Sequence, residues 1–181
     1  KKIRNGGTAN GRELAAQIPE NYVLARLHQG RLFMLCQVSG EGAVQVREDI
    51  VLADDVYYAA NGRVLLAHAT PATVQAIVAA RGLPGESWPE VQSAEELTAA
   101  LAAIRAVDVY SDVTHRQVAR VSCPLYQGEQ VVAAVGLYAP AFRFVGDYRE
   151  RAIAGLQAVA AQVSEDLGRG AGLGRFQQRP T

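Results

Sequence analysis

Hydrophobic and polar residues alternate in two pairs of neighbouring segments, and this pattern predicts two β-hairpins. Their bounds are residues 22–28 with 31–38, and residues 119–126 with 130–138. Gln29 and Gly30 form the turn of the first hairpin, and a glycine-containing turn joins the strands of the second. Shorter apolar runs at 43–46 and 108–110 predict two additional short strands.

Four segments repeat their apolar residues at the three- and four-residue spacing of a helix. They cover residues 59–67, 71–81, 94–106 and 147–168. Thr70 is the expected N-cap of the second helix, and Gly82 closes that helix. Ser93 and Glu96 form a capping box before the third, and Asp147 is expected to cap the fourth.

The order of these elements predicts the fold class. A hairpin, helices, a second hairpin and a long final helix favour an α+β fold, in which helices flank a mostly antiparallel sheet. A chain of 181 residues has the length of one domain. We place this domain at 21–168, after a linker or helix remnant at 1–20 and before a flexible tail at 169–181 that is rich in glycine and arginine.

Charge and composition limit the possible partners. The 18 Lys and Arg residues balance the 18 Asp and Glu residues, so the whole chain has no field that attracts nucleic acid. Three tail arginines, Arg169, Arg175 and Arg179, are too few to change this. No apolar run approaches the length of a membrane span, so no membrane partner is expected.

The cysteines and histidines indicate a cytoplasmic protein without a metal. Cys36 and Cys123 are far apart and belong to no CxxC motif, which suits two buried thiols in a reducing compartment. The three histidines form no HxxxH or similar spacing, so we expect no metal and no other cofactor. The first residues also contain no apolar stretch that would serve as an export signal.

Several motifs, taken in order, resemble the effector-binding half of IclR-type transcriptional regulators. They are NGRVLLA at 61–67, ARGL at 80–83, SAEEL at 93–97, the run 105–126 and VVAAVGLYAP at 131–140. The resemblance covers about residues 22–168. It implies a GAF/profilin-like domain that is not an enzyme and that binds a small-molecule effector. It also implies a homodimer or tetramer, and operator DNA bound only through a winged helix-turn-helix that the roughly 20 residues before the first strand cannot supply.

The resemblance places the effector over the sheet, beside the start of the first helix. The residues that it places there are Ala43, Val46, Ala60, Asn61, Gly62, Tyr110, Val118, Arg120, Gly136 and Tyr138. Asn61 and Gly62 would present backbone N–H groups to a carboxylate. A tight turn at these two residues is the plainer interpretation.

Arg120 is an unusual residue for an apolar strand. Alternation places it on the same face as Val118, opposite Ala119 and Val121. Family members often carry a small residue here, so Arg120 either confers specificity for an acid, by binding a ligand carboxylate bidentately, or fills the cavity. The alternative is an exposed arginine on an edge strand.

Tyr110 and Tyr138 suggest an aromatic or short organic acid as the ligand. Two tyrosines around the Arg120 guanidinium could enclose a planar ring and hydrogen-bond its substituents. Packing in the core is the alternative for both tyrosines, and also for the small apolar residues Ala43, Val46 and Ala60.

The sequence is also compatible with two other classes of function. A small enzyme could use Cys123, His115 and Arg120 on a bound acid, but no motif supports a nucleophile, and we assign no catalytic residue. A stand-alone assembly module would use the long amphipathic helix at 147–168 and the exposed strand edges only for association.

Overall fold

The molecule is built on one antiparallel sheet of five strands. The computed structural model describes residues 16–41, 44, 46 and 55–170. Within them the strand order is β2-β1-β5-β4-β3, and each neighbouring pair is antiparallel. The strands are β1 (Asn21–His28), β2 (Arg31–Val38), β3 (Tyr110–Val113), β4 (Val118–Gln127) and β5 (Gln130–Pro140). The two hairpins predicted from alternation are confirmed, and so is the α+β class.

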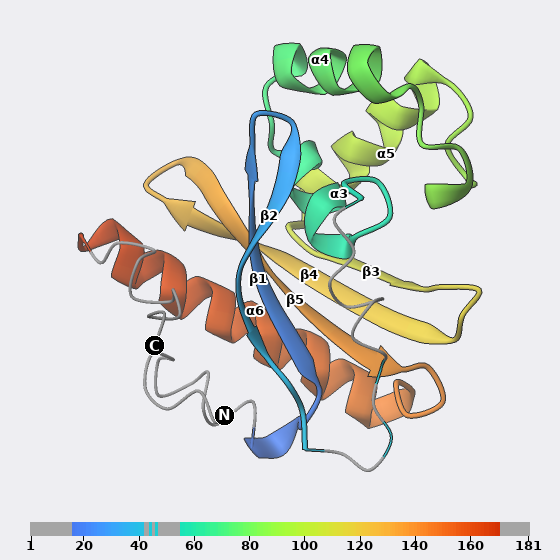
Figure 1. Cartoon of the computed structure of the whole chain (residues 1–181). Helices are drawn as coiled ribbons and strands as arrows, with labels where there is room; N and C mark the ends of the chain where they lie inside the picture. The colour runs from blue at the N-terminus through green and yellow to red at the C-terminus, as the bar shows by residue number, and fades with distance from the viewer. Residues whose placement is uncertain (1–15, 42–43, 45, 47–54, 171–181) are drawn as a thin grey trace, which may run out of the picture.

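Helices cover both faces of the sheet (Figure 1). They are α3 (Ala60–Ala67), α4 (Pro71–Arg81), α5 (Ala94–Val107) and α6 (Gly146–Gly168), with a 3₁₀ turn, η1 (Gly85–Ser87). The long helix α6 lies along one face, and α3 packs on the other with α5 behind it. The tip of the first hairpin reaches α4, where Gly30 lies against Ile77.

The alternation of β4 assigns its side chains to two separate cores. Ala119, Val121 and Cys123 face α6 and pack into the larger apolar cluster. Arg120 and its neighbours two residues away face α3 instead. The predicted facing of this strand is therefore confirmed, and β4 is an interior strand between β5 and β3.

Local capping signals predicted two of the helices well. The Thr70 side chain accepts the Thr73 N–H at 3.2 Å, and Gly82 ends α4 with a φ of 80°. The capping box of Ser93 and Glu96 is present in both directions at the start of α5.

Three predicted boundaries were wrong or lie partly outside the described residues. Asp147 is not the N-cap of α6, because the helix begins at Gly146 after an extended Val145, which leaves the aspartate in the first turn. The strand expected at 108–110 begins at Tyr110, since Asp108 adopts a left-handed conformation with φ of 52° and ends α5. Of the strand expected at 43–46, only residues 44 and 46 are described, and neither is in a strand.

None of the helices in the described part of the chain combines the length and the apolar character needed to cross a membrane.

Candidate functional site

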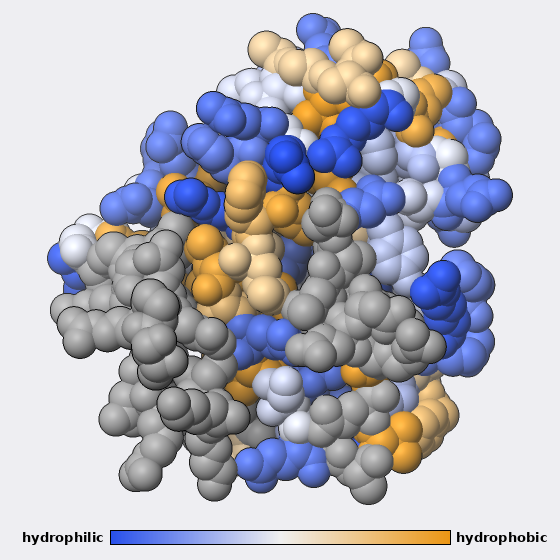
Figure 2. All heavy atoms as spheres, viewed as in Figure 1, coloured by the Kyte–Doolittle hydropathy of each residue, from blue (hydrophilic) through white to orange (hydrophobic). Residues whose placement is uncertain are grey.

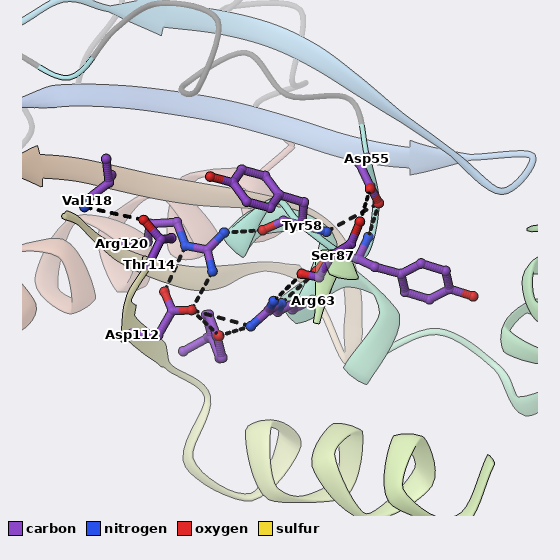
Figure 3. A network of polar contacts seen from close by, with 10 residues as sticks. Asp55, Tyr58, Arg63, Ser87, Asp112, Thr114, Val118 and Arg120 are labelled. Atoms are coloured by element: carbon purple, nitrogen blue, oxygen red, sulfur yellow. Dashed lines mark hydrogen bonds and ion pairs between the residues drawn. The ribbon is translucent and has the colours of Figure 1, made fainter. Parts of the chain in front are cut away.

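Arg120 is the centre of a buried polar network on the α3 side of the sheet (Figure 3). It is 2% exposed, so the alternative of an exposed edge-strand arginine is wrong. Its Nε donates to Asp112 Oδ1 at 2.8 Å and its Nη2 donates to Asp112 Oδ2, which makes the pair bidentate. Asp112 is the direct cross-strand neighbour of Arg120, so the β3–β4 pairing itself brings the two together.

A second buried arginine, Arg63 on α3, shares the same carboxylate. It is 3% exposed, and its Nη1 lies 3.4 Å from Asp112 Oδ2 and donates to the Tyr110 hydroxyl. Its Nη2 donates to the Ser87 carbonyl at 2.8 Å, and its guanidinium stacks 4.2 Å from the centre of the Trp88 ring. Arg63 therefore connects α3 to β3 and to the connection between α4 and α5.

The two arginines respond differently to this environment. Burial lowers the pKa of Arg63. Burial acts on Arg120 in the same direction, but its hydrogen bonds to Asp112 and the charge of that carboxylate outweigh it and raise the pKa of Arg120. Both side chains are therefore positive at neutral pH, since arginine starts far above it. Two buried positive charges contact one carboxylate.

The same arginines hold the turn that precedes α3. Arg63 Nε donates to the Tyr57 carbonyl at 2.6 Å, and Arg120 Nη1 donates to the Tyr58 carbonyl. Asp55 accepts the backbone N–H groups of Tyr57 and Tyr58 at 2.8 and 3.3 Å, which closes the turn from the other side. Within the described residues, Asp55 makes no ion pair with either arginine.

Two further side chains donate hydrogen bonds to backbone carbonyls of residues that precede this turn in the sequence. The Asn21 amide donates to the Val46 carbonyl at 3.2 Å, and Arg143 Nη2 donates to the Val44 carbonyl at 2.8 Å. Residues 44, 46, 57 and 58 are thus all held through their main chain.

The structure gives Asn61 and Gly62 packing roles. The Asn61 side-chain amide donates to the Val23 carbonyl at 3.0 Å and accepts a hydrogen bond from the Ser122 hydroxyl at 2.7 Å, so both its nitrogen and its oxygen bond to the protein. A Cβ atom on Gly62 would lie 2.2 Å from the Val56 carbonyl oxygen, so the glycine allows a second backbone to approach. Gly136 is equally constrained, since a Cβ there would lie 2.5 Å from Asn61 Oδ1.

Three of the other predicted site residues lie together beside Arg120. Val46, Val118 and Tyr138 belong to one apolar cluster with Val23 and Ala25, and Tyr138 is the cross-strand neighbour of Arg120. Burial raises the pKa of Tyr138 to about 12, although the positive charge of Arg120 opposes this.

Tyr110 joins the network of Arg120 through Asp112 and Arg63. Its hydroxyl donates to Asp112 at 2.7 Å and its ring faces Arg63, while the ring beside Arg120 is that of Tyr58, 4.9 Å from the guanidinium carbon. Ala60 is completely buried at the start of α3. Ala43 lies outside the described residues.

Sequence reasoning missed Tyr58, Arg63, Asp112 and Ser122 as members of this network. Asp112 could have been found, because continuing the β3–β4 hairpin from its turn places it opposite Arg120. Arg63 is an arginine inside an apolar helical run, which is itself a signal of an unusual environment.

The geometry does not support Cys123 as a nucleophile acting with Arg120. The two residues lie on opposite faces of β4. Burial raises the pKa of the Cys123 thiol to about 12, so the thiolate is scarce at neutral pH. A cleft of about 250 Å³ between β4 and α6 is lined by Cys123, Tyr126 and Ser164, among others, and by none of the predicted effector residues. In the described ranges, no three His, Cys, Asp or Glu side chains are grouped as metal ligands would be.

Comparison with known proteins identifies the domain. The model of the family described as bacterial transcriptional regulator IclR C-terminal matches residues 3–165. The solved C-terminal domain of KdgR from E. coli superposes with a TM-score of 0.70 at 20% identity, covering 88% of this chain and 94% of that one. Thermotoga maritima IclR gives a TM-score of 0.73 at 18% identity, over 88% of this chain and 66% of that one. None of the curated proteins matches the chain.

A further solved relative contains a ligand. It is an IclR homologue from Microbacterium hydrocarbonoxydans complexed with 4-hydroxybenzoate, with a TM-score of 0.73, 22% identity, and coverage of 90% of this chain and 66% of that one. The chain spans 63% of the length of a regulator from Silicibacter. The likeness to each of these structures is one of fold, whereas the family model covers most of the sequence. The chain therefore belongs to the family of C-terminal, effector-binding domains of IclR-type bacterial transcriptional regulators.

Proposed function

We propose that this domain senses an organic acid, aliphatic or aromatic, and that Arg120 receives the ligand carboxylate. The observation that carries this proposal is the charge of the buried network. Arg63 and Arg120 are 3% and 2% exposed, and Asp112 is the one carboxylate within ion-pair distance of them among the described residues. Burying an uncompensated charge is costly, so this arrangement favours a bound anion.

The guanidinium of Arg120 also has hydrogen-bonding capacity to spare. It carries five N–H donors, and bonds to Asp112 and to the Tyr58 carbonyl use three of them among the described residues. The apolar cluster of Val46, Val118 and Tyr138 beside it would bind the hydrocarbon part of the ligand.

The predicted site residues enter the proposal with different roles. Ala43, Val46, Val118 and Tyr138 would line the ligand. Ala60, Asn61, Gly62 and Gly136 would support this lining through packing, and Tyr110 would orient Asp112. That a relative binds 4-hydroxybenzoate favours including aromatic acids in the ligand class.

The test compares ligand-induced thermal stabilisation in the wild type, Arg120→Gln and Arg105→Gln. Arg105 donates to the carbonyl of Ala67, the last residue of α3, so its variant is matched for the loss of an arginine–carbonyl bond. The ligands are short aliphatic acids, aromatic acids and the neutral amide of each. A ligand at 100 times its Kd raises stability by about 2.7 kcal/mol, which is easily measured.

We expect acids but not amides to stabilise the wild type and Arg105→Gln, with at least a tenfold loss of affinity in Arg120→Gln. If the amides bind as well as the acids, or if Arg120→Gln binds acids like the wild type, the proposal is wrong.

Assembly is a second proposed function, supported by the edge strand β2. Phe33 and Met34 are 42% and 49% exposed on this strand, and Figure 2 shows hydrophobic residues along the β1–β2 hairpin in the middle of this face. An exposed apolar strand edge favours pairing with another chain. Sedimentation equilibrium should give the mass of a dimer or tetramer, and a monomer at all concentrations would contradict this.

We also propose that the domain, at 21–168, controls a DNA-binding region in a longer protein, because the shared fold covers only 66% of the length of two such relatives.

A further inference from the structure

Tyr58 is fixed against Arg120 by its main chain and by its ring. Its carbonyl accepts a hydrogen bond from Arg120 Nη1, and its N–H donates to Asp55 Oδ1 at 3.3 Å. Its ring lies 4.9 Å from the Arg120 guanidinium carbon, on which it stacks. These contacts hold the side chain in one position, so the place of its hydroxyl is set by the same arginine that would bind a ligand.

The hydroxyl of Tyr58 is buried and has no hydrogen-bond partner in the part of the chain that the structure describes. A phenol can donate one hydrogen bond and accept others, and buried polar groups are nearly always paired. The other tyrosine hydroxyls of the chain contrast with this one. Tyr57, for example, donates to the Gly82 carbonyl at 2.9 Å.

Among the described residues, the Tyr58 side chain lies beside an apolar cluster. Tyr58 packs against the apolar cluster that contains Val46, Val118 and Tyr138. Figure 3 shows its ring beside Arg120, with the hydroxyl directed away from the network of ion pairs. An unpaired hydroxyl in an apolar cluster next to a buried cation with spare donors has the character of a recognition group without its ligand.

We infer that the Tyr58 hydroxyl is a second recognition point, so that the effector is an acid carrying a hydroxyl or carbonyl group on an apolar body. This inference rests on the proposed function, since the carboxylate on Arg120 defines which part of the ligand reaches Tyr58. A site that holds an unpaired polar group discriminates strongly against an analogue that cannot pair it. Simple acids without the second group should therefore bind more weakly.

The experiment measures binding by calorimetry for matched pairs of acids. The pairs are benzoate with 3-hydroxybenzoate and with 4-hydroxybenzoate, and butyrate with 3-hydroxybutyrate and with 4-hydroxybutyrate. The proteins are the wild type, Tyr58→Phe and Tyr126→Phe. Tyr126 supplies a control for deleting a hydroxyl, because its hydroxyl bonds Asp108 and its ring contacts His68, at the opposite end of α3 from Tyr58.

For at least one pair, we expect the hydroxy acid to bind the wild type and Tyr126→Phe about tenfold more tightly than its parent acid, which corresponds to one net hydrogen bond. In Tyr58→Phe this preference should disappear, while the parent acid binds as before or better. A preference that persists in Tyr58→Phe overturns the inference, and so does its absence from every pair that binds. Failure of every acid to bind, or equal binding by Arg120→Gln, would instead refute the proposed function.

The ligand-free proteins give an independent result. Because Tyr58→Phe removes a hydroxyl without a partner, its melting temperature should equal or exceed that of the wild type. A lower melting temperature would mean that the protein itself pairs this hydroxyl, which would overturn the inference even without a ligand.

Discussion

Two buried ion-pair clusters of this domain differ in their balance of charge. Where the chain enters β1, the Glu20 carboxylate accepts Arg143 Nε at 3.1 Å, Arg143 Nη2 at 2.9 Å and the Tyr148 hydroxyl at 2.7 Å. One carboxylate meets one guanidinium, and a phenol completes the set. On the α3 side of the sheet, two guanidiniums contact the carboxylate of Asp112, and no other carboxylate of the described residues lies within ion-pair distance of them.

This difference separates a structural cluster from a candidate binding site. The Glu20 cluster is neutral and satisfies its own groups, so it needs nothing further to be stable. Among the described residues, the Asp112 cluster has two guanidiniums for one carboxylate, and it lies next to an apolar surface and a hydroxyl for which those residues supply no partner. Arginine and carboxylate side chains thus stabilise the fold in one cluster and form a candidate binding site in the other. The ratio of guanidiniums to carboxylates distinguishes the two clusters.

The largest effect should follow from Asp112→Asn. This change leaves Arg63 and Arg120 without a carboxylate, and breaking a buried pair in this way costs about 3–5 kcal/mol of unfolding free energy. A bound organic acid would supply the missing negative charge, so acids should raise the melting temperature of Asp112→Asn more than that of the wild type. Equal shifts in both proteins would contradict this.

A smaller loss is expected from Glu20→Gln, which is the same chemical change in the balanced cluster. The Arg143 side chain is 27% exposed and can turn to water, so we expect a loss of about 1–3 kcal/mol. Denaturant unfolding measures it. Organic acids should raise the melting temperature of Glu20→Gln no more than that of the wild type. A larger increase in Glu20→Gln would contradict the distinction between the two clusters.

The smallest effect concerns pH and lies outside both clusters, at His68. Burial lowers the pKa of His68 from 6.5. The negative charge of Asp108, whose Oδ1 lies 3.2 Å from His68 Nε2, acts in the opposite direction but is the smaller effect. The unfolded chain therefore binds this proton more readily, so stability is complete above pH 6.5 and is lost as the pH falls toward the lowered value. The slope cannot exceed about 1.4 kcal/mol per pH unit for one proton.

Melting temperatures of the wild type and His68→Gln between pH 5 and 8 measure this contribution. We expect the variant to lose part of the acid-side decrease. An unchanged pH profile would show that another group is responsible.

Short-range signals in the sequence predicted the features that depend on neighbours along the chain. The Ser93 capping box, the Gly82 terminus of α4 and the facing of Arg120 all follow from spacing over a few residues. Asp147 failed as a cap because the helix begins one residue earlier, at Gly146, which places the aspartate in the first turn.

The binding site was harder to predict, because its contacts join residues far apart in the sequence. Arg120 reaches the Tyr58 carbonyl over 62 positions, and Arg63 reaches Asp112 over 49. Spacing could indicate that Arg120 lies on the same face of its strand as Val118, but only the packed fold shows that the Asp112 carboxylate already binds the Arg120 guanidinium bidentately. The excess of positive charge is recognised only when the fold places Arg63 beside Arg120 and Asp112.

The hold of Asn21, Arg63, Arg120 and Arg143 on main-chain carbonyls has an evolutionary consequence. Every residue type has a backbone carbonyl, so these four hydrogen bonds do not depend on which side chains occupy positions 44, 46, 57 and 58. Substitutions there can change what the domain recognises while the anchoring stays intact. Ligand preference could therefore change between descendants of this domain by single substitutions. The intermediate sequences would keep these four hydrogen bonds.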